Sequence, residues 1–60
     1  MKIKELLYLY NLDSRVELYD NELRLIYQGT CKHLLSLKQF NKLQIKGISC
    51  AGYTLQLFVQ

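Results

Sequence analysis

The stretch Tyr53-Thr54-Leu55-Gln56-Leu57-Phe58-Val59 alternates more regularly than any other part of the 60-residue chain. Because successive side chains of a strand point to opposite faces of its sheet, this pattern predicts a half-buried strand over residues 53–59. Its core side is expected to carry Tyr53, Leu55, Leu57 and Val59. Its other side is expected to carry Thr54, Gln56 and Phe58.

A second strand is predicted immediately before this one, over residues 43–50. Its alternation slips by one position at Lys46-Gly47, since Ile45 is followed by Ile48 and Cys50. A glycine at such a slip is typical of a β-bulge. Ala51-Gly52 is then the expected two-residue loop of a hairpin.

A second hairpin is predicted in the first half of the chain. Residues 15–19 alternate, with Val16 and Leu18 inward, and the turn-forming stretch Asp20-Asn21-Glu22 follows. The returning strand is expected over residues 23–28, ended by Gly29. Its two faces are expected to carry Leu23, Leu25 and Tyr27 on one side, and Arg24, Ile26 and Gln28 on the other.

A short helix is predicted over residues 2–11, with Ile3, Leu6, Leu7 and Tyr10 on one stripe and Tyr8 nearly opposite. Residues 30–42 are the least regular segment, where Thr30 is suited to cap a helical turn carrying Leu34 and Leu35. The expected fold is therefore α+β: one domain over residues 1–60, with a short N-terminal helix packed on an antiparallel sheet of about four strands in two hairpins.

Size and composition suggest a cytoplasmic domain that associates with itself. A chain this short hides only roughly 60% of the surface that its unfolded form exposes, and half of these residues are hydrophobic. Neither a secretion signal nor a membrane-spanning run is visible, so Cys31 and Cys50 are expected as reduced thiols. The pattern from Met1 to the last residue is that expected of a complete small gene product.

Catalytic and metal-binding side chains are scarce. His33 is the single histidine, and Cys31-Lys32-His33 resembles a nucleophile beside a base without a third member. Cys31, His33 and Cys50 lack metal-site spacing, and Cys50 is expected as a small buried side chain. No glycine-rich phosphate loop is present. We therefore expect no enzyme, no metal and no cofactor.

The sheet face opposite the helix is the main candidate surface. The predicted register places Tyr19, Ile26 and Phe58 there, beside Arg15, Arg24 and Gln56. Large apolar side chains on such a face suggest a contact. Four interpretations are open: self-association about a two-fold axis, docking on another protein, stacking of RNA bases, or cover by residues 30–42.

Charge is unevenly spread along the chain. Residues 1–22 hold three basic and five acidic side chains, a net −2, whereas residues 23–60 hold five basic side chains and no acid, a net +5. A basic surface of Lys32, His33, Lys38, Lys42 and Lys46 could bind phosphates without sequence specificity, but a solvated loop is the preferred explanation.

The order of these segments resembles small phage and prophage proteins of Gram-positive bacteria. The resemblance runs from Ile3-Lys4-Glu5-Leu6-Leu7 through Val16-Glu17-Leu18-Tyr19-Asp20 and Leu25-Ile26-Tyr27-Gln28-Gly29 to Ile48-Ser49-Cys50 and Leu55-Gln56-Leu57. It implies a non-enzymatic inhibitor of bacterial defence, similar to anti-CRISPR proteins. Many of those are acidic mimics of nucleic acid, and this basic chain departs from them.

The working hypothesis is an inhibitor or adaptor that binds a bacterial protein complex as a homodimer. The alternative is a nucleic-acid-binding accessory protein that uses the basic segment 32–46. The expected partner-binding residues are Tyr8, Tyr19, Ile26 and Phe58 for apolar contacts, and Arg15, Arg24, Lys38, Lys42 and Lys46 for electrostatic ones.

Overall fold

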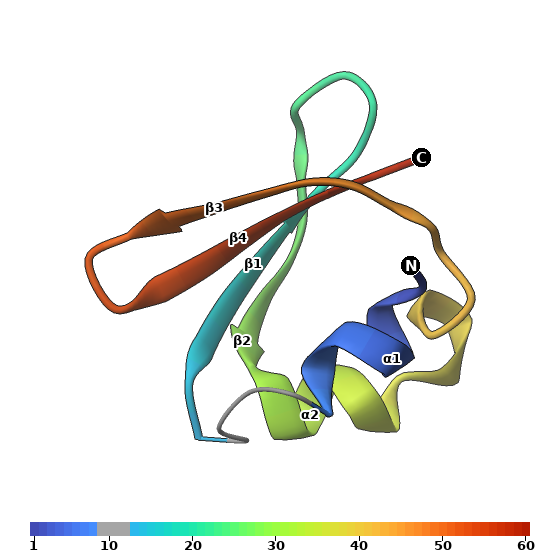
Figure 1. Cartoon of the computed structure of the whole chain (residues 1–60). Helices are drawn as coiled ribbons and strands as arrows, with labels where there is room; N and C mark the ends of the chain where they lie inside the picture. The colour runs from blue at the N-terminus through green and yellow to red at the C-terminus, as the bar shows by residue number, and fades with distance from the viewer. Residues whose placement is uncertain (9–12) are drawn as a thin grey trace.

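The computed structural model describes residues 1–8 and 13–60 of the chain. These residues form a two-layer α+β fold, in which helices cover one face of a four-stranded sheet (Figure 1). The elements in chain order are α1 (Ile3–Leu7), β1 (Arg15–Tyr19), β2 (Leu25–Thr30), α2 (Cys31–Ser36), the 3-10 turn η1 (Lys38–Phe40), β3 (Ile45–Ala51) and β4 (Thr54–Val59). The predicted fold class is confirmed; positions 9–11 of the predicted helix, including Tyr10, lie outside the described residues.

The sheet is mixed, not antiparallel throughout as expected. Its strand order is β2-β1-β4-β3, and the two central strands, β1 and β4, run parallel, with Arg15 opposite Thr54 and Tyr19 opposite Phe58. Each predicted hairpin is present as an antiparallel pair. Turn signals in a sequence specify which strands form a hairpin, but not how two hairpins join, so the parallel contact could not be predicted.

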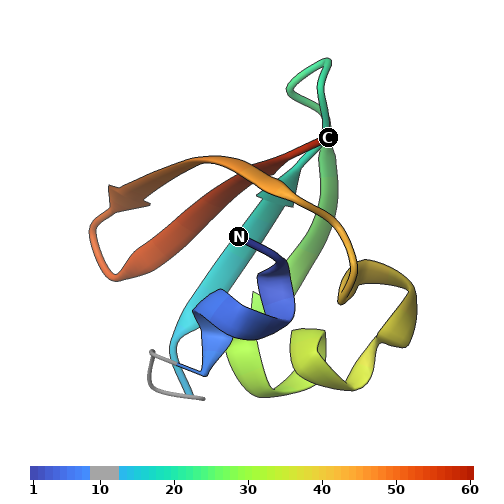
Figure 2. The ribbon, with the colours of Figure 1, turned by 45° about the vertical axis from the view of Figure 1, so that its right-hand side comes forward.

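The core lies between the inner sheet face and the helices. Ile3, Leu6 and Leu7 of α1 and Cys31 and Leu34 of α2 pack on the buried side chains Val16, Leu18, Leu55, Leu57 and Val59. Figure 2, turned from the first view, shows both helices on the same side of the sheet. The opposite face, called the outer face below, is covered by none of the described elements.

The β1–β2 turn differs from the prediction. β2 begins at Leu25, so Leu23 and Arg24 belong to the turn. Leu23 and Leu25 are both exposed instead of facing the core with Tyr27. The residue with positive φ is Leu23, at 62°, and not one of the Asx residues expected to tolerate it. The pairing also shifts between Leu18 and Tyr19, where β2 has one residue more than β1.

The β3–β4 hairpin confirms the predicted bulge, because the register shifts between Ile45 and Gly47. Its turn lies one residue later than expected. Ala51 pairs with Thr54, and Gly52 has a φ of +62°, a conformation that glycine adopts without steric cost. Tyr53 therefore stands in the turn and is fully exposed, not in the core. Cys50 is also exposed, because the helices do not cover this edge of the inner face.

The helical turn expected within residues 30–42 is confirmed, and it is longer than expected, because it forms the helix α2. The Thr30 hydroxyl accepts a hydrogen bond from the His33 backbone N–H (3.2 Å), which satisfies one of the free donors at the start of α2. Gly29 precedes it inside β2, which continues to Thr30 instead of ending at Gly29. The Tyr27 side chain lies so close over Gly29 that a Cβ atom there would collide with it. No helix in the described part of the chain is long and apolar enough to cross a bilayer.

Candidate binding surfaces

The centre of the outer face holds a carboxylate surrounded by donors. Glu17 of β1 accepts hydrogen bonds from the Tyr19 hydroxyl (2.9 Å), from Gln56 Nε2 of β4 (3.2 Å) and from Gln28 Nε2 of β2 (3.2 Å). These bonds, that from Gln56 foremost, lower the pKa of Glu17, and the Glu17 carboxylate raises the pKa of Tyr19. Side chains of three strands are thus joined by hydrogen bonds across the outer face.

An aromatic pair lies beside this cluster. The rings of Tyr19 and Phe58 stack with centroids 5.3 Å apart and an interplanar angle of 21°. Phe58 also lies beside Gly47 of β3, where a Cβ atom would be in van der Waals contact with the ring at 3.6 Å. Both aromatic residues are outside the core cluster and half-buried. The predicted outward direction of Phe58 is therefore confirmed, although each ring covers part of the other.

The β1–β2 turn, called the hairpin tip below (residues 20–24), is organised by Asp20. Its Oδ1 accepts hydrogen bonds from the backbone N–H groups of Glu22 (2.9 Å) and Arg24 (3.0 Å), and its Oδ2 pairs with Arg24 Nε (3.0 Å). These bonds, that from the Arg24 backbone first, lower the pKa of Asp20. The backbone adds Leu23 N–H to Asp20 O and Asp20 N–H to Arg24 O, both 3.0 Å. Five hydrogen bonds, three to the Asp20 side chain and two between backbone groups, therefore close the tip.

Three large apolar side chains are exposed at and beside the hairpin tip. Leu23 is 67% exposed, Leu25 48% and Ile26 39%. Leu25 is opposite Tyr19 in the register, and Tyr19 is opposite Phe58. The apolar residues of the tip therefore continue across β1 and β4 as a row that ends at the aromatic pair.

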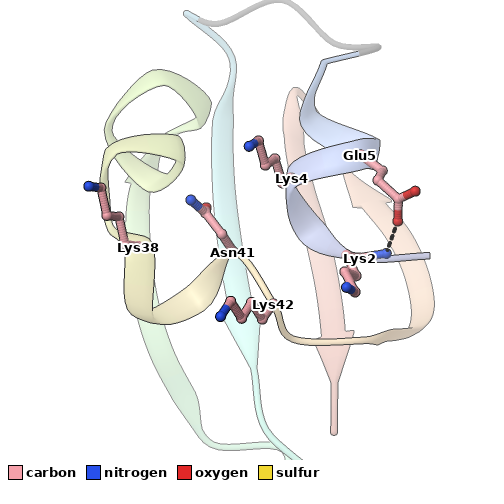
Figure 3. Close-up of a pocket in the computed structure, with 6 residues that line it drawn as sticks. All are labelled: Lys2, Lys4, Glu5, Lys38, Asn41 and Lys42. Atoms are coloured by element: carbon pink, nitrogen blue, oxygen red, sulfur yellow. Dashed lines mark hydrogen bonds between the residues drawn. The ribbon is translucent and has the colours of Figure 1, made fainter.

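A separate pocket lies on the helix side of the molecule, with a volume of about 540 Å³. Its lining residues are Lys2, Lys4, Glu5, Lys38, Asn41 and Lys42. Figure 3 shows the first three on the α1 side and the last three on the side of η1. We call this feature the lysine pocket; four of its six side chains are cationic and one is anionic.

Backbone bonds hold the two walls of the lysine pocket together. Ile3 N–H donates to Leu43 O (3.2 Å), Ile45 N–H donates to Met1 O (2.8 Å), and Lys2 forms an isolated bridge with Gln44. Asn41 Nδ2 donates to Leu35 O (3.3 Å), which ties the η1 wall to α2. The amino-terminal residues thus act as a short extra strand that brings Lys2 and Lys4 to Lys38 and Lys42.

Cys31 and His33 do not form a nucleophile–base pair. Cys31 is in the core, where burial raises the pKa of its thiol. His33 Nδ1 lies 2.8 Å from the Tyr27 hydroxyl, which also contacts Thr30 O (3.3 Å). Burial is the main cause of a raised pKa at Tyr27. The prediction that Cys50 is a small buried side chain on a strand is wrong, since Cys50 is exposed.

The predicted partner-binding residues are distributed over several surfaces. Tyr19, Phe58 and Arg15 lie on the outer face, and Ile26 lies at the bulge of β2. Arg24 was expected on that face too, but the Asp20 carboxylate and Glu22 (3.4 Å) hold it in the turn. Tyr8 is exposed at the end of α1, Lys38 and Lys42 line the lysine pocket, and Lys46 is exposed on β3.

Sequence reasoning missed Glu17, Leu23, Lys2 and Lys4. Glu17 and its two glutamine partners occupy matching positions of three strands, a relation visible only once strand order is known. Leu23 was placed in the core by alternation. Lys2 and Lys4 come from the acidic half of the sequence and join the basic half only through the fold.

Comparisons with family models, with curated proteins and with solved structures find no match. Among the described residues, no group of three or more His, Cys, Asp or Glu side chains is placed to hold a metal ion. Function must therefore be inferred from the surfaces of this chain itself.

Proposed function

We propose that this chain is a non-catalytic binding module that docks on another protein through the hairpin tip. The observation that carries the proposal is Leu23, an exposed leucine with a φ of 62°. A non-glycine residue pays roughly 1–2 kcal/mol in this conformation. Backbone strain of this kind is concentrated at binding and active sites.

The strained backbone conformation of Leu23 is not offset by burial of its side chain within the monomer. Its side chain is 67% exposed and belongs neither to the core nor to the residues packed on it. A glycine would satisfy the same turn at lower cost. A large apolar side chain in its place is therefore best explained by a partner that buries it.

The Asp20 hydrogen bonds make the tip suitable as an anchor. A side chain that is already held in its bound position loses less conformational entropy on binding. The tip's charges are largely paired with one another, through Arg24 with Asp20 and Glu22. The expected partner site is accordingly an apolar hollow that accepts Leu23, with Leu25 and Ile26 at its rim.

The wider proposal follows the resemblance to small phage and prophage proteins. The partner would be a bacterial protein complex, such as a CRISPR–Cas defence system in the host cytoplasm, and the chain would inhibit it by occlusion. A homodimer through the outer face is compatible with this, because the hairpin tip projects from one end of the sheet (Figure 1).

The test is a pull-down from a bacterial lysate with wild-type protein, Leu23→Gly and Tyr53→Gly. Leu23→Gly should keep or raise thermal stability, because it relieves the strained φ, yet lose at least tenfold in partner recovery. Tyr53→Gly removes a fully exposed aromatic from the opposite end of the sheet and should bind as wild type.

Two results would contradict the proposal. One is a wild-type protein that retains no stoichiometric protein partner. The other is Leu23→Gly binding its partner as tightly as wild type does.

The second candidate function, nucleic-acid binding by residues 32–46, draws on Lys38 and Lys42. These two lysines line the same pocket as Lys2 and Lys4, whereas Lys32 and Lys46 are not among its described lining residues. The described lining also contains no aromatic side chain on which a base could stack. Protein docking is therefore favoured.

A further inference from the structure

We infer that the lysine pocket is a binding site for a compact anion with two or more linked phosphates. This inference goes beyond protein docking and depends on a different part of the molecule. The pocket is within the 300–1,000 Å³ range typical of small-molecule sites. Its side chains carry four positive charges and one negative charge, a net +3.

The lysine charges in the pocket are not neutralised by the protein. Among residues 1–8 and 13–60, both ion pairs that involve side chains are made by Arg24, and none by Lys2, Lys4, Lys38 or Lys42. Glu5 is the only carboxylate in the lining. Its Oε1 accepts a hydrogen bond from the Lys2 backbone N–H (2.8 Å), so this oxygen serves the start of α1 and not an ammonium group.

Gathering four cations without counter-charges is unfavourable for the folded chain. Like charges around one pocket repel, and a bound anion reduces that repulsion. The lysines could have stayed apart, since Lys32 and Lys46 do so on the same fold. The backbone bridge of Lys2 with Gln44 instead places lysines of residues 1–22 beside the segment that carries Lys38 and Lys42.

The lining selects among anions by charge alone. Lysine is a compact point charge that binds phosphate without the fixed fork of arginine. With a net +3 to balance, linked phosphates fit better than one phosphate or a carboxylate. Among its described lining residues, the pocket has no aromatic ring on which a nucleobase could stack. The shared chemistry of inorganic polyphosphate and of a nucleotide's phosphate chain is what it recognises.

Calorimetric titration of the full chain at low salt tests this inference, with tripolyphosphate, ATP and inorganic phosphate as probes. We expect one site per chain. The dissociation constants of tripolyphosphate and ATP should agree within about fivefold, and inorganic phosphate should bind at least 30-fold more weakly. ATP more than tenfold tighter than tripolyphosphate would support the site and assign it to nucleotides.

Matched variants separate a pocket from general basicity. The double variant Lys38→Gln/Lys42→Gln should weaken the binding of tripolyphosphate at least tenfold. The double variant Lys32→Gln/Lys46→Gln loses the same charge and should change this affinity less than twofold. All four side chains are exposed, so both variants are expected to fold, and circular dichroism checks this.

The inference is overturned if tripolyphosphate does not bind, or if both double variants weaken its binding equally. Neither outcome bears on Leu23, so this site and the docking proposal fail independently.

Discussion

Asp20 shows how much of this molecule depends on one side chain. It accepts two backbone N–H groups and pairs with Arg24, and so sets the shape of the turn that presents Leu23. Glu17 has a similar position on the outer face, where one carboxylate connects three strands. Both are acids placed where their charged forms are stabilised by donors, and both pKa values are lowered.

The lowered pKa of Asp20 predicts acid sensitivity of the hairpin tip. A group with a depressed folded-state pKa contributes stability that is present above its unfolded pKa, about 3.9 for aspartate. That contribution is lost as the pH falls further, through the folded-state pKa. Asp20→Asn keeps an acceptor oxygen but does not titrate. Its melting temperature should therefore fall less than that of wild type between pH 5 and pH 2.5.

Thermal unfolding followed by circular dichroism, in one series of buffers for both proteins, measures this difference. The same acid-induced loss in both would contradict the prediction. Glu17 also has a lowered pKa, so some acid sensitivity is expected to remain in Asp20→Asn.

The helix α2 depends on the capping residue that precedes it. With six residues it is too short to be stable alone, and its start is supported by the Thr30 hydroxyl. Thr30 is also the last residue of β2, so the same residue ends the strand and begins the helix. At the junction of β2 and α2, the Tyr27 hydroxyl lies 2.8 Å from His33 Nδ1.

Thr30→Ala should cost about 1 kcal/mol of unfolding free energy, the usual value for loss of an N-cap side chain. In a domain of this size that corresponds to roughly 4–8 °C in melting temperature. Thr30→Ser, which keeps the acceptor oxygen, should retain most of the stability. Equal losses in both variants, measured by urea unfolding, would show that the methyl group and not the cap is important.

The candidate surfaces lie on different parts of the molecule. The helices pack on the inner sheet face, and the outer face carries the Glu17 cluster and the stacked Tyr19–Phe58 pair. The hairpin tip lies at one end of the sheet, and the lysine pocket lies on the helix side. A 60-residue domain seldom has enough core to be very stable, and covering the outer face in a homodimer would help.

Phe58→Glu tests the homodimer. The ring stacks on Tyr19 and is not part of the core, so the variant should fold, with a loss near the 0.5–1.5 kcal/mol of an aromatic pair. Sedimentation at micromolar concentration should show a dimer for wild type and a monomer for Phe58→Glu. Tyr53→Glu, the same change in an exposed aromatic of the β3–β4 turn, should remain dimeric. A monomeric wild-type protein would rule out this interface.

Local patterns were enough to predict the fold class, both hairpins, the bulge at Gly47 and the Thr30 cap. Each of these depends on residues close together in the chain: alternation for strands, the i, i+3, i+4 stripe for α1, a glycine or a capping side chain at an irregular point. The predicted strand boundaries were wrong where turn hydrogen bonds or strand pairing outweighed the alternation of side chains. Asp20 draws Arg24 and Leu23 into the turn, and the pairing of Ala51 with Thr54 leaves Tyr53 in solvent.

Contacts between distant residues determined the rest. The parallel pairing of β1 with β4, the meeting of Gln28, Glu17 and Gln56, and the approach of Lys2 and Lys4 to Lys38 and Lys42 all join residues far apart in sequence. Hydrophobic periodicity and secondary-structure propensity depend on residues that are close in sequence. They contain no information on how one hairpin pairs with another. The lysine pocket depends on such placement, because it joins lysines of residues 1–22 with lysines of residues 23–60. The positive φ of Leu23 arises within a local turn, but alternation placed this residue in a strand, so only the folded turn shows it.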